Sequence, residues 1–592
     1  MRFYGPLFRS IAIGAALVLL PLFAAAQTPD QKPAEHEVDI TWAQKIPLRD
    51  GVKLNATLYR PHDAAPSPAI FTLTPYIGDT YHPRAMYFAQ HGYVFLLVDV
   101  RGRGNSGGDF EPFANEGRDG YDVVEWIAKQ PWCNGKVTMW GGSYAGFDQW
   151  STLKEFPPHL ATIVPAAAAH PGVDFPAFEN IPTLYLMQWL TFTSGLTGND
   201  HLFGEGNFWH SKDMDIYRGH LAFSELDRIV GNPSPVFHKW LAHPTADAYF
   251  NAMVPTAADY HRISIPILTI TGDYDGDQAG ALTYYRRHMK DGSQDAISNH
   301  YLIIGPWDHA GTRTPNPDVG GLHFGPVSML DLNKLHTEWY GWTMQGGPKP
   351  EFLKKRVAYY VTGAEEWKYA DTLDGIATGK RTLYLASNGF ANDVFHSGSL
   401  LEEAPTSPEP DHFVYDPLDT RPGEVETEVG GLVSQADALN LFGAGLVYHT
   451  EALSEATEIS GFVKLSLWIS MDVPDTDLAV GLYEILPDGR SVQLTGDVKR
   501  ARYRESLTEA KLVTPGKIER YDFDGFTWFS RRIAKGSRLR IVVEALNSPD
   551  SEKNYNSGGA VENETVQDAR TAHITLYHDA QHPSVLEVPI VK

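Results

Sequence analysis

Continuous apolar runs alternate with segments of helical spacing along residues 37–155 and again along 261–352. Two strands are expected first, at 38–42 and 52–59, with Asp50-Gly51 as the turn between them. The later apolar runs lack the polar alternation of a half-exposed strand, which is typical of a parallel sheet covered by helices on both faces. Such buried strands are predicted at 69–74, 93–100, 136–140, 265–270 and 300–304, with helices at 82–91, 119–129 and 144–154.

Two further regions follow different patterns. Between about 156 and 260 the strand rhythm stops, and aromatic residues and Met recur at helical spacing, which predicts a helical insertion. After residue 353 short strands alternate polar and apolar positions, with a hairpin turn at Asp488-Gly489, which predicts an antiparallel sandwich. The expected organisation is an α/β core at 37–155 and 261–352, a helical cap at 156–260 and a β-sandwich at 353–592.

The N-terminus has the features of a secretory signal peptide. Arg2 and Arg9 precede or flank an apolar run at 11–20, and Ala24-Ala25-Ala26 supplies a small-residue cleavage site. A membrane anchor is the alternative, but Pro21 interrupts the run and no charged flank follows it. No later stretch is long and apolar enough to span a bilayer. We therefore expect residues 1–26 to be removed after Ala26 and the mature protein to be periplasmic or secreted.

The composition is that of a globular protein. Of 592 residues, 43% are hydrophobic and 21% are charged. The net charge is −24, and it becomes −26 once residues 1–26 are removed. A surface this acidic repels phosphate backbones, so nucleic acid is not an expected partner. The single cysteine, Cys133, rules out an intramolecular disulfide and zinc sites built on several thiolates.

A nucleophile elbow is predicted at residues 142–146, which read Gly-Ser-Tyr-Ala-Gly. The motif alone is weak, and a plain Gly/Ser turn is the alternative, but a buried strand precedes it and a helix is expected after it. A serine hydroxyl needs a base, and in this architecture an acid and a histidine follow later strands. His309 follows one such strand, and the acid is one of Asp273, Asp275 and Asp277 after another.

Two other motifs imitate ligand-binding loops. Residues 102–107 spell a dinucleotide fingerprint after a strand, but residues 108–112 separate them from any helix, so that interpretation is weak. The aspartates at 273, 275 and 277 resemble the start of a calcium loop. Its sixth position is Gln278 instead of Gly, and its twelfth is Tyr284 instead of Glu. No metal and no cofactor are therefore expected.

Six segments of the chain carry a further signal, at 99–108, 130–137, 140–144, 305–309, 475–477 and 500–504. Together they resemble the CocE/NonD hydrolases, the group of cocaine esterase, α-amino acid ester hydrolases and glutaryl acylases, which are related to X-Pro dipeptidyl-peptidases. The resemblance covers nearly the whole mature chain. It implies an α/β-hydrolase core, an inserted helical cap and a C-terminal all-β jelly-roll sandwich.

The resemblance also implies roles for individual residues. Ser143 would be the nucleophile, Asp275 the triad acid and His309 the base, since the family's acid follows an aromatic residue such as Tyr274. The Tyr76 hydroxyl and the backbone N–H of Tyr144 would form the oxyanion hole, in which one donor is typically worth about 10²–10³ in rate.

Substrate recognition is expected near the triad acid and in the cap. The amino acid ester hydrolases bind a substrate ammonium with acidic residues near the triad acid. This chain keeps one such carboxylate, Asp277, but has Gln278 where another would stand. The alternative for Asp277 is to cap the helix that begins near Gln278. In the cap, one helical face carries an aromatic stripe of Phe178, Tyr185, Trp189 and Phe192. Such a stripe belongs either to the core or to the wall of a pocket. Trp189 is the residue of this stripe that we expect to bind substrate.

The sequence therefore predicts a secreted serine hydrolase that cleaves an ester or amide through an acyl-enzyme. Its partner would be a small-molecule ester, an amide or a short peptide. The sequence leaves the oligomeric state open, and a homo-oligomer is compatible with it. One alternative is a serine peptidase of the X-Pro dipeptidyl-peptidase type. Another is a non-catalytic binding protein that uses its β-sandwich.

Overall fold

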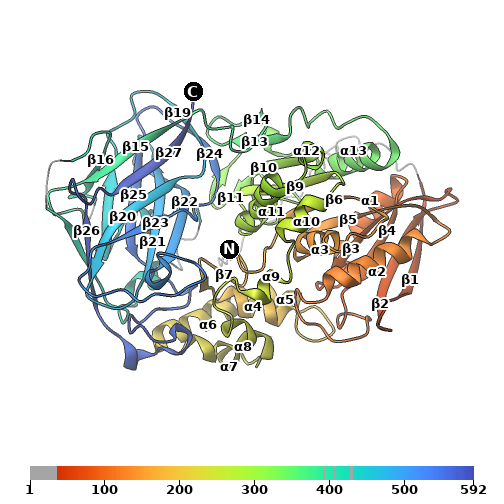
Figure 1. Cartoon of the computed structure of the whole chain (residues 1–592), viewed down its shortest axis with the longest axis horizontal. Coiled ribbons are helices and arrows are strands. Elements are labelled where there is room, and N and C mark those ends of the chain that lie inside the picture. Colours follow the sequence, from red (N-terminus) through yellow and green to blue (C-terminus); the bar gives the residue numbers. More distant parts are fainter. Residues whose placement is uncertain (1–35, 393, 406–408, 427–430) are drawn as a thin grey trace, which may run out of the picture.

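The protein consists of an α/β core, a set of short helices and a β-sandwich (Figure 1). The computed structural model describes residues 36–392, 394–405, 409–426 and 431–592. The expected signal peptide, 1–26, lies outside the described residues. Figure 1 shows the core and the sandwich side by side, with the short helices along the lower edge of both. The expected fold class, an α/β-hydrolase core with a C-terminal β-sheet domain, is confirmed.

The core contains a ten-stranded sheet. Its central strands run parallel to one another, whereas two strands at one edge and one strand at the other edge join the sheet by antiparallel pairing. In spatial order the strands are β1 (Val38–Pro47), β2 (Lys53–Pro61), β4 (Val94–Asp99), β3 (Ser67–Thr74), β5 (Cys133–Ser143), β6 (Leu160–Ala168), β9 (Ile267–Tyr274), β10 (His300–Asp308), β13 (Val357–Val361) and β14 (Glu366–Ala370).

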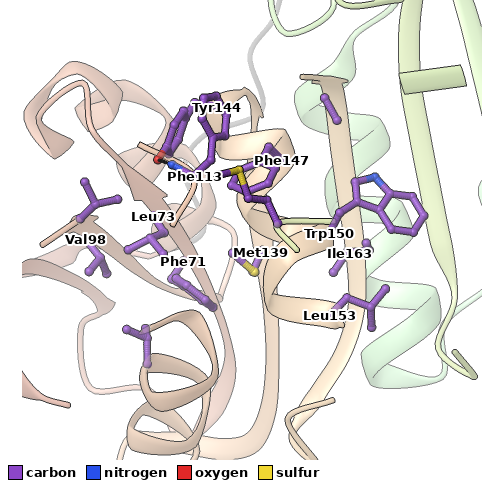
Figure 2. Close-up of a cluster of buried hydrophobic side chains, with 14 of the residues drawn as sticks. Phe71, Leu73, Val98, Phe113, Met139, Tyr144, Phe147, Trp150, Leu153 and Ile163 are labelled. Atoms are coloured by element: carbon purple, nitrogen blue, oxygen red, sulfur yellow. Dashed lines mark hydrogen bonds between the residues drawn. The ribbon is translucent and has the colours of Figure 1, made fainter. Parts of the chain in front are cut away.

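Helices cover both faces of this sheet, as the unbroken apolar runs predict. Successive side chains of β3 point to opposite faces of the sheet, because Phe71 belongs to one apolar cluster and Ile70 to another. The first cluster, part of which Figure 2 shows, includes side chains of α2 (Glu116–Ala128) and α3 (Tyr144–Leu153). The second includes side chains of α1 (His82–Gln90) and α13 (Leu332–Gln345). Two further helices, α11 (Gln278–Asp291) and α12 (Gln294–Ser298), lie between β9 and β10 in the chain.

Strand β6 corrects the expected start of the cap. The sequence pattern placed 156–260 in the helical insertion, but residues 160–168 pair with both β5 and β9 in the middle of the sheet. This strand reads Leu-Ala-Thr-Ile-Val-Pro-Ala-Ala-Ala. Ala and Pro are poor strand formers, so its local preference concealed a strand that burial on both faces stabilises.

The expected boundary between 352 and 353 does not coincide with a change of sheet. Strands β13 and β14, which follow it, pair with β10 and with each other in the core sheet. The strands of the sandwich begin at Gly379. Local polarity could not show this, because a strand's pattern does not reveal which sheet it joins.

The inserted region contains short helices and one small hairpin. The hairpin pairs β7 (Ala177–Phe178) with β8 (Ile181–Pro182). The helices are α4 (Tyr185–Phe192), α5 (Asp200–Phe203), α6 (Gly206–Gly219), α7 (Leu226–Val230), α8 (Pro235–Leu241), α9 (Ala248–Asn251) and α10 (Ala257–Arg262).

The C-terminal sheet is mainly antiparallel and has a large apolar core beside a smaller apolar cluster. The alternating residues of β20 face this core, as predicted, and the hairpin at Asp488-Gly489 joins β21 to β22. Its strands are β15 (Gly379–Ala386), β16 (Gly398–Leu401), β17 (Asp411–Tyr415), β18 (Gly445–His449), β19 (Thr457–Gly461), β20 (Lys464–Met471), β21 (Asp477–Ile485), β22 (Ser491–Arg500), β23 (Glu519–Phe523), β24 (Phe529–Ile533), β25 (Arg538–Ala545), β26 (Ala572–Tyr577) and β27 (Val585–Val591). Two short helices, α14 (Arg421–Glu426) and α15 (Gln435–Leu439), accompany them.

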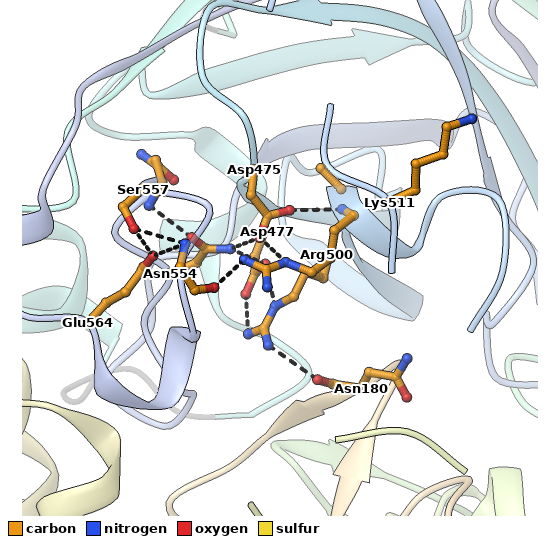
Figure 3. A network of polar contacts seen from close by, with 12 residues as sticks. Asn180, Asp475, Asp477, Arg500, Lys511, Asn554, Ser557 and Glu564 are labelled. Atoms are coloured by element: carbon orange, nitrogen blue, oxygen red, sulfur yellow. Dashed lines mark hydrogen bonds and ion pairs between the residues drawn. The ribbon is translucent and has the colours of Figure 1, made fainter. Parts of the chain in front are cut away.

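A buried ionic network connects the sandwich to the inserted hairpin (Figure 3). The Arg500 guanidinium lies 2.8 Å from the Asp477 carboxylate and 2.7 Å from that of Glu552. It also donates to the backbone carbonyl of Asn180 in the β7–β8 turn, at 3.5 Å. Buried charges are tolerated only when they are paired, so this network fixes where the inserted region meets the sandwich.

Among the residues that the structure describes, no helix is both long enough and apolar enough to cross a membrane.

Candidate active site

Ser143 occupies a strained turn between β5 and α3. Its backbone has φ 62° and ψ −126°, in the left-handed half of the map that residues with a side chain rarely adopt. A Cβ on Gly146 would lie only 2.7 Å from the carbonyl oxygen of Ala166 on β6. The glycine therefore lets α3 approach the sheet closely enough for this turn, as the elbow motif requires.

His309 and Asp275 meet at the ends of neighbouring strands. The Nδ1 atom of His309 lies 2.8 Å from Oδ1 of Asp275. The Asp275 carboxylate also accepts hydrogen bonds from the Thr271 hydroxyl at 2.8 Å and from the backbone N–H of Asp277 at 3.0 Å. These bonds fix its orientation, while 28% of the His309 side chain stays exposed and reachable by substrate.

The alternative acid, Asp273, points elsewhere. Its side chain is buried, and burial raises its pKa well above the usual range, an effect that a hydrogen bond from the Ser530 backbone opposes. Of the three aspartates that the sequence left open, Asp275 is the one that hydrogen-bonds the imidazole.

Tyr76 lies beside the nucleophile. Its hydroxyl oxygen is 3.5 Å from the Ser143 Oγ atom and accepts a hydrogen bond from Trp189 Nε1 at 3.1 Å. Its ring stacks on Phe192, with centroids 5.2 Å apart. Trp189 is only 4% exposed and stacks on Tyr144 as well. Of the predicted stripe, Trp189 and Phe192 are thus core residues, whereas Tyr185 is exposed and Phe178 is half-buried. Trp189 reaches the site through its indole N–H.

The Tyr144 side chain faces away from the nucleophile. Its hydroxyl donates to Glu116 at 2.6 Å and accepts the backbone N–H of Phe113 at 2.7 Å. Burial raises the pKa of Glu116 to about 7. Its backbone N–H, as the first of α3, has no acceptor within the helix.

Asp277 lies at the N-cap position of α11, but its side chain makes no capping hydrogen bond. Its Oδ2 atom is instead 3.8 Å from Nδ1 of His309. Burial raises the pKa of Asp277 to about 6, an effect that the nearby imidazole opposes. The position of the carboxylate thus favours a role in the site over the capping role.

Gln278 is not available to a substrate. It is fully buried, and its amide nitrogen donates to the carbonyl of Trp528 in the sandwich at 2.8 Å. Its amide oxygen accepts the Trp528 backbone N–H at 2.7 Å. The residue joins the loop of the triad acid to the C-terminal domain.

Two charged residues near the site were missed by the sequence reasoning. Asp174, after β6, accepts the backbone N–H of Gly280 at 2.5 Å, and burial and then the charge of Asp277 raise its pKa well above the usual range. The Arg313 side chain lies against Gly142, where an added Cβ would fall 2.8 Å from its Cδ. Arg313 follows His309 by four positions and could have been suspected, whereas Asp174 lies in a loop without a distinguishing pattern.

Comparison with known proteins gives matches along the chain. The catalytic domain of the S15 family, described as X-Pro dipeptidyl-peptidase, matches residues 50–311. The X-Pro dipeptidyl-peptidase C-terminal non-catalytic domain matches residues 352–587. Cocaine esterase of Rhodococcus sp. (strain MB1 Bresler) is 26% identical over 580 residues, which cover 92% of this chain and 98% of the relative.

This chain is a serine hydrolase that is similar to cocaine esterase and to the X-Pro dipeptidyl-peptidases. Two solved structures share its fold over nearly their whole length. An aminopeptidase from a marine sediment Thaumarchaeota archaeon superposes with a TM-score of 0.81 at 22% identity, covering 95% of this chain and 98% of the other. An α-amino acid ester hydrolase gives a TM-score of 0.81 at 21% identity, with 97% and 100% covered. The non-catalytic binding protein considered from the sequence is thereby set aside.

Replacing Asp275 is expected to cost this hydrolase far more than replacing Asp273. Asp275→Asn should lower kcat about 10³–10⁴-fold, because an amide favours the wrong imidazole tautomer and cannot stabilise imidazolium. Asp273→Asn should keep most of the activity, since its buried side chain makes no contact with His309. Steady-state kinetics on an activated ester measure both variants, and equal losses would refute the choice of acid.

The pH dependence of kcat/KM should report the charge of Asp277. Burial alone would lower the pKa of His309. The negative charge of Asp277 and the contact with Asp275 have the opposite effect, and together they raise the pKa above 6.5. Because only the neutral imidazole accepts a proton, activity should rise with pH through a midpoint above 6.5. Asp277→Asn removes a charge that stabilises imidazolium, so the midpoint should move to lower pH. Asp273→Asn is the control and should leave the profile in place; an unmoved midpoint in the Asp277 variant would contradict this electrostatic account.

Proposed function

We propose that this serine hydrolase transfers the acyl group of a small ester or amide to water through an acyl-enzyme on Ser143. The observation that carries the proposal is the contact between the His309 imidazole and the Asp275 carboxylate. Asp277 lies near both this imidazole and the hydroxyl of Ser143 in its strained elbow. His309 would accept the Ser143 proton as the hydroxyl attacks the carbonyl carbon. It would then deliver that proton to the departing alcohol or amine.

The second half of the reaction reverses these roles. A water molecule would give a proton to His309 and attack the acyl-enzyme carbonyl, which releases the acid and restores the Ser143 hydroxyl. In both halves the imidazole carries a positive charge for a time. The Asp275 carboxylate, held by Thr271 and by a backbone N–H, would stabilise that charge without itself becoming protonated.

The oxyanion of each tetrahedral intermediate would lie between the Tyr76 hydroxyl and the Tyr144 backbone N–H. Burial raises the pKa of Tyr76, so the phenol stays protonated and can donate. Because its oxygen already accepts from Trp189, its own proton is left free to point toward the serine. A preoriented donor of this kind stabilises charge that develops only in the transition state.

The substrate class that the site supports best carries a free amine on the acyl side. Asp277 lies on the same loop as the triad acid, makes no capping bond and adjoins a second acidic side chain, Asp174. An ammonium group would offset two carboxylates that are held close together. The names of the aminopeptidase and the α-amino acid ester hydrolase among the structural neighbours point in the same direction.

An X-Pro dipeptidyl-peptidase activity is the second candidate, and the match to that family's catalytic domain favours it. Both activities would use the same triad. They differ in whether the amine belongs to the acyl residue itself or lies one residue further from the scissile bond.

We also propose that the protein is exported. The support is the charged, apolar and small-residue pattern of residues 1–26.

Asp277→Asn should selectively impair substrates with an α-amine. On an amino acid ester we expect kcat/KM to fall roughly 10- to 100-fold, the value of a hydrogen bond to a charged group. The rate on the des-amino analogue of the same ester should change little when measured at a pH well above the midpoint for His309, since Asn keeps the shape of the side chain. Kinetics on both esters and on an Xaa-Pro amide measure the effect. If the wild type shows no preference between the two esters, the amine-binding role is wrong; if it prefers the Xaa-Pro amide, the peptidase candidate is the correct one.

A further inference from the structure

The glycine-rich loop after β4 contains a buried arginine that the reaction as described does not use. Arg103 is 0% exposed. Burial lowers its pKa to about 10, so it remains a cation at neutral pH. A buried cation is costly unless its donors are satisfied. Other buried arginines of the protein, such as Arg500, meet carboxylates instead.

The guanidinium of Arg103 donates only to backbone carbonyls among its hydrogen bonds in the described residues. Its Nε atom donates to Pro75 at 2.8 Å. Its two terminal nitrogens donate to the segment 192–197, which begins at the last residue of α4. A guanidinium has five N–H donors, and with the Pro75 carbonyl and the four carbonyls of this segment each donor has an acceptor. These acceptors are the carbonyls of Phe192 at 3.4 Å, Ser194 at 3.0 Å, Gly195 and Thr197 at 3.2 Å.

The two segments that Arg103 joins both determine where Tyr76 lies. Pro75 directly precedes Tyr76 in the loop after β3. The other segment begins at Phe192, whose ring stacks on that of Tyr76, and α4 carries Trp189, whose indole N–H binds the Tyr76 hydroxyl. Arg103 thus holds the tyrosine loop on one side and the end of a cap helix on the other.

We propose that Arg103 is a positioning residue for the Tyr76 hydroxyl, which it sets relative to Ser143 by locking the Pro75 carbonyl to the 192–197 segment of the cap. This inference rests on the proposed oxyanion role of Tyr76. It gives the glycine-rich loop a function that differs from nucleotide binding. It also implies that the cap and the oxyanion site are placed together, so a shift of α4 would alter catalysis without touching the triad.

The test is a double-mutant cycle with Arg103→Lys and Tyr76→Phe. Lysine keeps the charge but has only three donors on a flexible stem, so it cannot hold all five carbonyls. Tyr76→Phe alone should lower kcat on an activated ester about 100-fold with little change in KM. Arg103→Lys alone should lower kcat about 10-fold or more. In the Tyr76→Phe background Arg103→Lys should lower kcat by less than about 3-fold, because the hydroxyl that Arg103 positions is already absent.

Arg101→Lys is the matched control. Arg101 belongs to the same loop, but it pairs with Asp119 at 2.6 Å and Asp50 at 3.0 Å and has no contact with the tyrosine loop. Its effect on kcat should be small and the same in both backgrounds. If Arg103→Lys does not yield folded protein, Phe192→Leu loosens the same cap segment against the Tyr76 ring and takes its place in the cycle.

The outcomes separate this inference from the proposed function. Losses that multiply in the two backgrounds, or an Arg103→Lys enzyme with unchanged kcat, would overturn the positioning role while leaving the oxyanion assignment intact. A Tyr76→Phe enzyme with nearly normal kcat would overturn the oxyanion assignment itself, and the positioning role with it. Thermal unfolding of each variant shows whether a loss of kcat reflects a loss of folded protein.

Discussion

The turn at Ser143 is the constraint on which the rest of the active site depends. A residue with a side chain holds a φ of 62° only if its surroundings favour that conformation over relaxed ones. Here the buried strand β5 fixes the residue before the turn, and the close packing of α3 on β6 fixes the residues after it. The small residues Gly146 and Ala166 permit that packing. The serine side chain is therefore presented at the carboxyl edge of the sheet, where β9 and β10 also deliver Asp275 and His309.

The electrostatics of the site follow from placing several carboxylates around one imidazole. Asp275 is bound by three hydrogen-bond donors, whereas Asp277 lies 3.8 Å from the same ring with no capping partner. One carboxylate is thus committed to His309, whereas the other lies near both the imidazole and the Ser143 hydroxyl, and in the proposed function it is the one that would meet a substrate cation. The C-terminal sandwich contributes to this arrangement, because Gln278 bonds the backbone of Trp528 on both its amide atoms. Although the matching domain is described as non-catalytic, it supports the loop that carries the triad acid.

The sequence was most informative where function depends on local geometry. The elbow at Ser143, the strand ends before Asp275 and His309, and the alternating strands of the sandwich all have short-range signatures. It did not predict β6 as a strand, because an Ala-rich strand owes its conformation to the neighbouring strands on both sides. It also assigned β13 to the wrong sheet, because the sheet that a strand joins depends on its pairing partner. Asp174 and the carbonyl-binding role of Arg103 were equally hidden, since both depend on contacts between segments that are far apart in the chain.

Identification of the residue that carries the acyl group tests the account most directly. The enzyme would be treated with a fluorophosphonate, digested, and mapped by mass spectrometry, with Ser143→Ala treated in parallel. We predict a single phosphonyl adduct on Ser143, with complete loss of ester hydrolysis. The Ser143→Ala protein should show neither adduct nor turnover while keeping the wild-type unfolding temperature. An adduct on another residue, or a Ser143→Ala enzyme that turns over ester at nearly the wild-type rate, would contradict the account.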